Sequence, residues 1–283
     1  MPDTFLHYDV VDVFAESPFA GNQLAVVHGA DGVSDQGLLA ITREFNFSET
    51  TFPVPLGPDR YRVRIFTPGG EIPFAGHPTL GTAWVLRERG ELSGARAVQE
   101  CGAGEIAVRL AEDVIELTAA PRDLVGPLDD AEVEAVLAAV GLGPHDRDGD
   151  AWLAGTGLTF VHVPVKEAAV ARAGAARAMP ALPPTGDPLG GINLYAVTAD
   201  LDVHSRVFVP DLAVPEDPAT GSAAAGLGMA LRARGLAGEG SRYRIRQGLE
   251  MGRPSLLLGT VAAKGISVAG AVHPVARGEI QVP

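Results

Sequence analysis

Sulfur and positive charge are both scarce in this chain. A single cysteine, Cys101, occurs among 283 residues, which excludes an internal disulfide framework and is typical of a reducing compartment. Lysine and arginine total 22 against 35 aspartates and glutamates, giving a formal net charge of −13. Phosphate binding needs a basic face, and no basic run with interleaved aromatics occurs. We therefore expect no nucleic-acid partner and no anionic membrane partner.

Long apolar runs are also missing. No stretch reaches the ~18 residues that a membrane span requires. The first residues, MPDTFLHYDVVDVF, lack the basic region and following apolar run of a secretory signal. At 46% hydrophobic and 20% charged residues, the composition is that of a globular protein. The sequence thus predicts an acidic, soluble, cytoplasmic protein.

Motifs for metals, nucleotides and hydrolase chemistry are absent too. The seven histidines are scattered, and neither His-Glu-x-x-His nor a paired cysteine motif occurs, so we expect no metal. Gly102-x-Gly104 lacks the third glycine of a dinucleotide fingerprint, and no P-loop lysine pattern is present. Ser222 lies in GSAAAG rather than G-x-S-x-G, which argues against a hydrolase nucleophile. No cofactor is expected.

Strand patterns and turns dominate the chain. Helical spacing is confined in the first half to 35–46, with Asp35 as the expected N-cap, and to a helix from His77 to about Arg89 that Gly90 ends. Alternation predicts strands over 5–14, 23–27, 60–68, 97–110 and 113–120. The Pro-, Gly- and Asp-rich segment 120–130 near the midpoint predicts a boundary between domains 1–123 and 124–283. The final strand, GEIQVP, could complete either domain's sheet.

The second half repeats the plan of the first. Residues 62–90 can be placed over residues 207–235 without a gap, at an offset of 207 − 62 = 145. Both segments read as strand, proline, glycine, helix and a glycine stop. An offset near half the chain length predicts a duplication, that is, two similar domains with one special helix each. The coinciding residues are Glu71, Pro73, Gly76, Gly81, Leu86, Arg87, Arg89 and Gly90 with Glu216, Pro218, Gly221, Gly226, Leu231, Arg232, Arg234 and Gly235.

The two repeated helices are rich in small residues, which predicts burial. Each is expected to begin at a glycine, so that its first amide groups carry no covering side chain and form an anion site. If both N-termini face one cleft, that cleft would hold a small carboxylate. Polar residues cluster at the same starts, namely His77, Asp217 and Ser222. The alternative is that the glycines only permit turns and that Asp217, Thr220 or Ser222 only caps a helix.

One carboxylate, Glu49, stands in the apolar stretch FNFSETTF (45–52). The alternation from Phe45 onward is typical of the start of a half-buried strand. A carboxylate flanked by Phe45, Phe47 and Phe52 would be desolvated, which raises its pKa and makes it a proton carrier near neutral pH. The alternative is that Glu49 caps a turn with Ser48.

These residues carry a family resemblance. The stretches DVFAESPFAGNQLAVV, NFSETTFPVP, RIFTPGGEIPFAGHPTLGTAWVL, DPATGSAAAG and QGLEMGRPS resemble the phenazine-biosynthesis PhzF family, in the family's order and over nearly the whole chain. The resemblance implies an α+β fold of the diaminopimelate-epimerase type. In that fold two similar domains, related by a pseudo-two-fold duplication, each curl a mostly antiparallel sheet around a central helix, and the active site lies between them.

The resemblance also implies an activity and a set of site residues. The family's characterised member isomerises trans-2,3-dihydro-3-hydroxyanthranilate without a cofactor. Its catalytic residues match Glu49, His77 and Asp217, and its substrate-carboxylate contacts match Gly76, Gly221 and Ser222. Related racemases of the same fold use two cysteines, whose places fall here at Ala75 and Thr220. A two-thiol mechanism is therefore not expected. Family members are homodimers, which we expect here as well.

Two function classes remain open from the sequence. The first is a cofactor-independent isomerase or epimerase that moves a carbon-bound proton in a small unsaturated amino or hydroxy acid, with Glu49 as the general acid and base. The second is a non-catalytic homologue that binds a small acid in the same cleft. A variant of the first, acting on another unsaturated substrate, would differ only in pocket shape. The family pattern commonly has proline at position 23, where this chain has Gln23.

Overall fold

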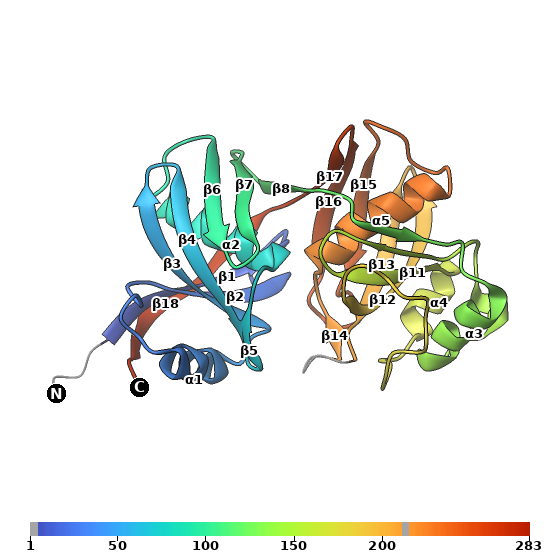
Figure 1. The fold of residues 1–283 in the computed structure, drawn as a ribbon, viewed down its shortest axis with the longest axis horizontal. Helices are drawn as coiled ribbons and strands as arrows, with labels where there is room; N and C mark the ends of the chain where they lie inside the picture. Colours follow the sequence, from blue (N-terminus) through green and yellow to red (C-terminus); the bar gives the residue numbers. More distant parts are fainter. Residues whose placement is uncertain (1–4, 211–214) are drawn as a thin grey trace. The chain divides into compact units, whose positions relative to one another are not determined.

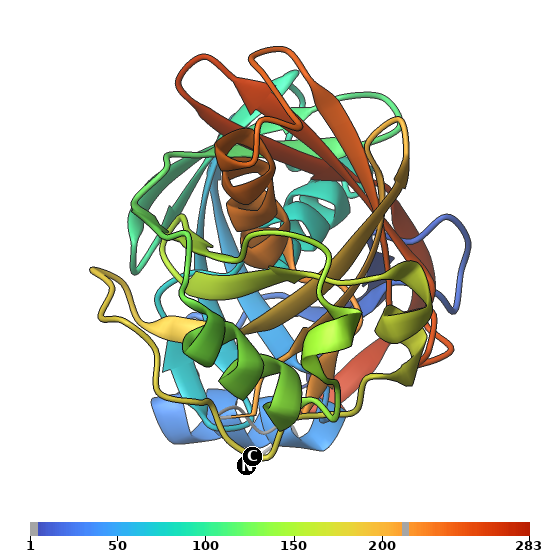
Figure 2. The same cartoon turned by 90° about the vertical axis from the view of Figure 1, so that its right-hand side faces the viewer.

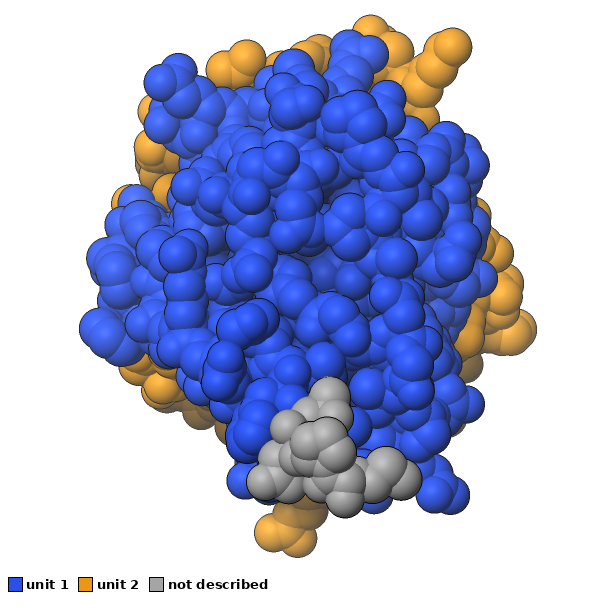
Figure 3. Space-filling model, turned by 90° about the vertical axis from the view of Figure 1, so that its left-hand side faces the viewer, with its two compact units in different colours: residues 1–117, 269–283 blue, residues 118–268 orange. Residues whose placement is uncertain are grey.

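The computed structural model describes residues 5–210 and 215–283, which form two compact units. Unit 1 contains residues 1–117 and 269–283, and unit 2 contains residues 118–268. Figure 3 shows the two segments of unit 1 in one colour, merged into one continuous surface. The sequence-based division fell at 123/124, whereas the compact units divide at 117/118, and the C-terminal strand belongs to unit 1. Within the described ranges, no helix is long and apolar enough to cross a membrane.

Unit 1 is a sheet with one helix against each face (Figure 1). Its elements are β1 (Phe5–Val13), β2 (Asn22–Val27), α1 (Asp35–Phe45), β3 (Glu49–Gly57), β4 (Arg60–Thr67), β5 (Gly70–Ile72), α2 (Gly76–Glu88), β6 (Arg96–Cys101), β7 (Gly104–Leu110), β8 (Ile115–Ala119, which spans the unit boundary) and β18 (Val272–Gln281).

Unit 2 has the same plan with additional outer helices. Its elements are β9 (Asp123–Val125), α3 (Asp130–Ala139), the short 3-10 helix η1 (Pro144–Asp146), β10 (Trp152–Gly155), β11 (Thr159–Pro164), α4 (Glu167–Arg172), β12 (Leu189–Ala199), β13 (Asp202–Phe208), β14 (Glu216–Asp217), α5 (Gly221–Ala233), β15 (Arg242–Gln247), β16 (Ser255–Ala262) and β17 (Gly265–Gly270).

The strand pairings show the duplication directly. In unit 1, β2 pairs in parallel with β3, β3 and β5 pair antiparallel with β4, and β4 pairs in parallel with β6. In unit 2, β11, β12, β13, β14 and β15 repeat these relations in the same order. Each special helix follows the short strand, α2 after β5 and α5 after β14. The predicted duplicated α+β fold is therefore confirmed.

The repeat contains a gap that the ungapped alignment missed. Phe66 faces Glu71 across β4 and β5, and Phe208 faces Glu216 across β13 and β14. The first pair is five positions apart and the second eight, so unit 2 has three more residues between strand and turn. The helices keep the offset of 145, whereas the preceding strands are offset by 208 − 66 = 142.

Strand alternation assigns opposite faces to the inner and outer helices. In unit 1, Phe52 of β3 packs with Leu38 and Ile41 of α1, whereas Thr51 bonds Thr82 of α2 at 2.8 Å between hydroxyl oxygens. In unit 2, α3 and α4 pack with Val161 and Val163 on one face, and α5 packs with Phe160 on the other. Figure 2 shows α3 and α5 with the sheet of unit 2 between them. α2 and α5 are thus the inner helices.

Glycine in each inner helix allows close packing on the sheet. A Cβ at Gly81 would lie 2.5 Å from Leu24, and a Cβ at Gly226 would lie 2.6 Å from Nε2 of His162 and 2.7 Å from the Ala154 carbonyl oxygen. These two glycines occupy equivalent positions in the repeat. Contacts this short allow only a hydrogen atom at these positions.

The helix ends mostly follow the sequence signals, with one correction. Gly90 and Gly235 adopt positive φ of 76° and 73° just past α2 and α5, as expected for glycine that ends a helix. The cap of α1 was predicted wrongly, because Ser34 rather than Asp35 is the N-cap and accepts a 3.2 Å bond from the Gly37 amide. Phe45 is the last residue of α1, and the following strand begins only at Glu49.

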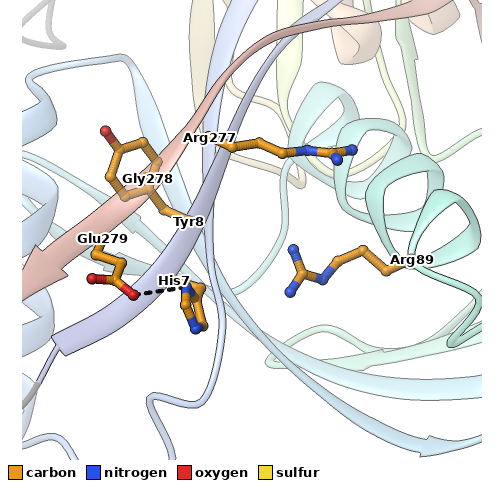
Figure 4. Close-up of a pocket in the computed structure, with 6 residues that line it drawn as sticks. All are labelled: His7, Tyr8, Arg89, Arg277, Gly278 and Glu279. Atoms are coloured by element: carbon orange, nitrogen blue, oxygen red, sulfur yellow. Dashed lines mark ion pairs between the residues drawn. The ribbon is translucent and has the colours of Figure 1, made fainter.

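A buried carboxylate joins the C-terminal strand to the rest of unit 1. Asp9 is 3% exposed and receives Arg89 from the end of α2 at 2.9 Å, Arg277 from β18 at 2.8 Å and His28 at 2.9 Å. Figure 4 shows both arginine side chains at a shallow surface pocket of about 340 Å³. Glu279 also lines this pocket, and Glu91 pairs with Arg89. Together with Asp9, these carboxylates neutralise the positive charge of the two arginines.

Candidate functional site

Glu49 is the first residue of β3 and points to the inner face of unit 1. It is two residues before Thr51, which bonds the inner helix, so alternation places both side chains on that face. Phe52 lies on the opposite face among the residues packed on α1. The expectation that Phe52 flanks Glu49 is therefore wrong.

His77, the second residue of α2, faces this carboxylate. Its Nε2 atom lies 3.6 Å from Oε2 of Glu49, and the two side chains are 5% and 16% exposed. This separation is longer than a hydrogen bond. Among the described residues, Oε2 of Glu49 accepts no hydrogen bond. The structure thus brings two predicted site residues together, with one carboxylate oxygen available to a further group.

Burial raises the pKa of Glu49 to about 7, and interaction with the Ser48 side chain offsets part of this rise. Loss of water destabilises the charged carboxylate more than the neutral acid, which explains the direction. A carboxyl group with a pKa near 7 is present in both protonation states at neutral pH. It is therefore suited to take and return a proton.

Asn22, which the sequence reasoning did not select, connects these groups. Its Nδ2 atom lies 3.5 Å from Nδ1 of His77, and its Oδ1 accepts a 3.2 Å bond from Ser48. An amide nitrogen donates, so Nδ1 of His77 is the acceptor and the neutral ring carries its proton on Nε2, toward Glu49. The only sequence signal for Asn22 was its position within AGNQLAVV.

The duplicated scaffold carries this acid once. Thr50 pairs with Phe66, and Ile192 pairs with Phe208, so Gly191 occupies in unit 2 the position of Glu49. A Cβ at Gly191 would lie 2.2 Å from the Phe208 carbonyl oxygen, which leaves no room for a carboxylate. Ser222 stands at the position of His77 in the inner helix. Unit 1 alone therefore carries this acid–histidine pair.

The remaining predicted residues lie together in unit 2. Asp217 ends β14, and Gly221 and Ser222 begin α5. Thr220 is the N-cap, but its hydroxyl does not cap the helix and instead donates to Oδ2 of Asp217 at 2.5 Å. The alternative that the Thr220 side chain caps α5 is therefore wrong.

In both inner helices the side chain of the N-cap residue makes no capping hydrogen bond. The N-cap of α2 is Ala75, which has no polar side chain, and Gly76 is the first helical residue. The first amides of such a helix attract an anion, more so where no side-chain oxygen satisfies them. Gly76 and Gly221 keep this end open in their own units. Among the described residues, no group of three or more His, Cys, Asp or Glu side chains could hold a metal ion.

Comparison with known proteins identifies the class of protein and then the family. The fold is shared with a hydroxyproline epimerase from Agrobacterium vitis (TM-score 0.64, 13% identity, 98% of this chain and 93% of that chain). A structure described as a predicted epimerase from Pseudomonas aeruginosa matches more closely, with a TM-score of 0.85, 32% identity and coverage of 97% and 99%. These neighbours define an epimerase-like fold.

The chain belongs to the phenazine biosynthesis-like (PhzC-PhzF) family, which residues 11–278 match. It is 36% identical to the trans-2,3-dihydro-3-hydroxyanthranilate isomerase of Pseudomonas chlororaphis, over 89% of this chain and 88% of that protein. It is also 36% identical to an uncharacterized isomerase of Mesorhizobium japonicum, over 94% and 93%. The resemblance found in the sequence is thus confirmed, and these relatives are named isomerases.

Proposed function

We propose that this protein is a cofactor-independent isomerase that moves a carbon-bound proton in a small unsaturated amino or hydroxy acid. The observation that carries the proposal is the carboxyl group of Glu49, with a pKa near 7 and one oxygen 3.6 Å from a histidine nitrogen. The substrate class follows the isomerases to which the chain is 36% identical. Trans-2,3-dihydro-3-hydroxyanthranilate is the substrate to test first.

Glu49 acts as the general base and then as the general acid. Its carboxylate removes a proton from a carbon next to the unsaturated system, and the neutral acid returns that proton to another carbon on the same face. Because Gly191 stands where a second acid would be, the duplicated scaffold offers no equivalent partner, which favours a mechanism with one base. With one carboxyl group, the proton that is removed can be returned by the same residue.

The other site residues bind and orient the substrate. His77, with its proton on Nε2, donates to the group that gains negative charge when Glu49 removes the proton. Asp217 accepts from the substrate's amino or hydroxyl group. The uncapped amides at Gly76 and at Gly221 and Ser222 hold the substrate carboxylate. The dimer expected from the family stays a prediction.

Product formation separates this proposal from its alternative, a non-catalytic protein that binds a small acid. The protein would be titrated with trans-2,3-dihydro-3-hydroxyanthranilate by calorimetry, and the ultraviolet spectrum would then be followed at saturation. A spectral change with turnover supports the isomerase. Binding with an unchanged spectrum favours the non-catalytic homologue. Absence of both binding and change would reject this substrate and direct the search to other unsaturated acids.

A further inference from the structure

The segment QGLEMGRPS (247–255), which the sequence alone did not explain, begins with a buried amide. Gln247 is the last residue of β15 and is 2% exposed. A buried primary amide needs hydrogen-bond partners to offset its loss of water. Its partners lie in the turn between Asp217 and the first residue of α5.

The Gln247 amide spans this turn from both ends. Its Nε2 donates to the Asp217 carbonyl oxygen at 2.7 Å and to Thr220 Oγ1 at 3.1 Å. Its Oε1 accepts from the Thr220 amide at 3.4 Å. Because Thr220 Oγ1 receives this bond, the hydroxyl proton is directed away from Gln247 and toward Asp217 Oδ2, 2.5 Å away. Gln247 thereby fixes both the backbone and, through Thr220, the carboxylate of Asp217.

The following glycine packs against the same turn. Gly248 has a φ of +73°, and a Cβ on it would lie 2.4 Å from the Arg253 carbonyl oxygen and 2.8 Å from that of Pro218. The Arg253 amide donates back to the Gly248 carbonyl at 3.0 Å and closes the loop. Only glycine combines this φ with this contact. The loop is therefore a rigid support for residues 217–220.

A second support fixes the residue before Asp217. Arg206 makes two 2.8 Å bonds to the Glu216 carboxylate, and the two side chains are 8% and 12% exposed. Glu250 of the same loop lies 3.9 Å from Nε of Arg206. A bidentate pair shielded from water restricts both side chains to one geometry. The loop thus contacts Pro218 directly and reaches Glu216 through Arg206.

The loop after β6 in unit 1 is the counterpart of the loop after β15, and comparing the two shows which contact occurs beside Asp217 alone. Arg60 pairs with Val98, and Asp202 pairs with Arg244, so Cys101 is the counterpart of Gln247. Gly102 packs on Pro73 as Gly248 packs on Pro218. The Cys101 thiol, however, donates within its own loop, to Gly104, and the counterpart of Asp217 is Ile72. The glycine support is therefore repeated, whereas the amide occurs only beside Asp217.

We propose that Gln247 is a positioning residue that holds Asp217 and the N-terminal end of α5 in a substrate-ready geometry. This inference rests on the proposed function for its catalytic consequence, but its structural part stands on the contacts above. Near-attack geometry is sensitive to displacements of an ångström, which can cost about a hundredfold in rate. We therefore expect loss of the Gln247 amide to reduce turnover by about tenfold to a hundredfold.

The test compares Gln247→Met, Thr220→Val and the positional control Cys101→Ala in the full-length protein. Amide hydrogen exchange followed by mass spectrometry reads out residues 217–224 against the start of α2, and kcat and KM are measured on trans-2,3-dihydro-3-hydroxyanthranilate. We expect Gln247→Met to accelerate exchange at 217–224 alone and to lower kcat. Thr220→Val should show a smaller effect on both, and Cys101→Ala should match the wild type. Thr220→Val carries the test if Gln247→Met does not fold.

Unchanged exchange at 217–224 in both unit 2 variants would overturn the proposal. Faster exchange with wild-type kcat and KM would overturn the catalytic consequence. If the wild-type protein does not turn over this substrate, the proposed substrate fails, and the exchange data still decide whether Gln247 positions Asp217. The two failures are thus distinguishable.

Discussion

Oε2 of Glu49 and Nε2 of His77 lie 3.6 Å apart at the start of the inner helix of unit 1, and both side chains are largely shielded from solvent. The acid begins a strand, the imidazole begins a helix, and Asn22 directs the imidazole proton toward the acid. This relationship, with a carboxyl pKa near 7, is the basis of the first prediction.

The first prediction concerns the pH dependence of turnover. If Glu49 removes the proton, it must begin as a carboxylate, so kcat/KM should fall about tenfold per pH unit below a pKa of about 7. An unperturbed glutamate would give this fall only near pH 4. The profile is measured between pH 5 and 8.5 in a constant-ionic-strength buffer. A flat profile down to pH 5 would argue against Glu49 as the base.

The second prediction concerns stability and two buried titratable groups, Glu49 and His162. Glu49 has a folded pKa raised from 4.5 to about 7, so the folded state binds more protons in that window and stability falls as pH rises through it. Burial lowers the pKa of His162 from 6.5 to about 4. For His162 the unfolded state binds more protons, so stability falls as pH drops from 6.5 to 4.

These opposite slopes should nearly cancel in the wild type. In Glu49→Gln the histidine slopes remain, from His162 and from His28, whose pKa is also lowered by burial, and Tm should rise between pH 4.5 and 6.5. In His162→Gln the Glu49 slope is opposed by that of His28, whose lowered pKa Asp9 partly offsets, and Tm should fall over the same window. Each effect is about 2 to 3 kcal/mol at most, from 1.36 kcal/mol per pKa unit. Parallel Tm–pH curves for the two variants in calorimetry would contradict at least one of the two pKa assignments.

The third prediction concerns the packing of an inner helix. Gly226→Ala places a Cβ 2.6 Å from His162 Nε2 and 2.7 Å from a backbone oxygen, so the helix must shift. Alanine normally stabilises a helix by about 1 kcal/mol relative to glycine, but overpacking should make this change destabilising by about 1 to 3 kcal/mol. Gly238→Ala, with no atom within 4 Å, is the control. Denaturant unfolding should separate the two variants, and equal midpoints would show that the sheet yields.

The fourth prediction concerns the buried carboxylate of unit 1. Asp9→Asn removes the negative charge that Arg89, Arg277 and His28 share. Loss of one partner from a buried ion pair costs about 3 to 5 kcal/mol, reduced here because Arg277 is 66% exposed. We expect a loss of about 2 to 3 kcal/mol and faster hydrogen exchange in β18. Exchange in β18 identical to that of the wild type would show that its strand pairing alone holds it.

Much of the fold was predictable because short sequence patterns mark its main elements. The repeat with glycines at 81 and 226 and the stops at Gly90 and Gly235 mark both inner helices in the sequence. The different lengths of the β4–β5 and β13–β14 connections were not predictable. The three extra residues before Glu216 become visible only once the strand pairing shows which residues face each other. The expectation that Phe52 flanks Glu49 overlooked strand alternation, which places residues 49 and 52 on opposite faces.

The sequence identified the candidate site residues but not the residues that hold them in position. Glu49, His77 and Asp217 stand in motifs, so the sequence could select them. Asn22 and Gln247 act through contacts with residues 55 and 30 positions away. No local sequence pattern identifies such partners, because the residues around Asn22 and Gln247 resemble those around any buried asparagine or glutamine.

The most direct test of the central claim follows deuterium rather than product alone. Trans-2,3-dihydro-3-hydroxyanthranilate would be incubated in D₂O with the wild-type protein and with Glu49→Gln, and carbon-bound protons would be followed by NMR. The account predicts isomerisation with the wild type, and neither isomerisation nor carbon-bound exchange with Glu49→Gln, which should still bind the substrate. Isomerisation by Glu49→Gln at the wild-type rate would contradict the assignment of Glu49 as the proton carrier.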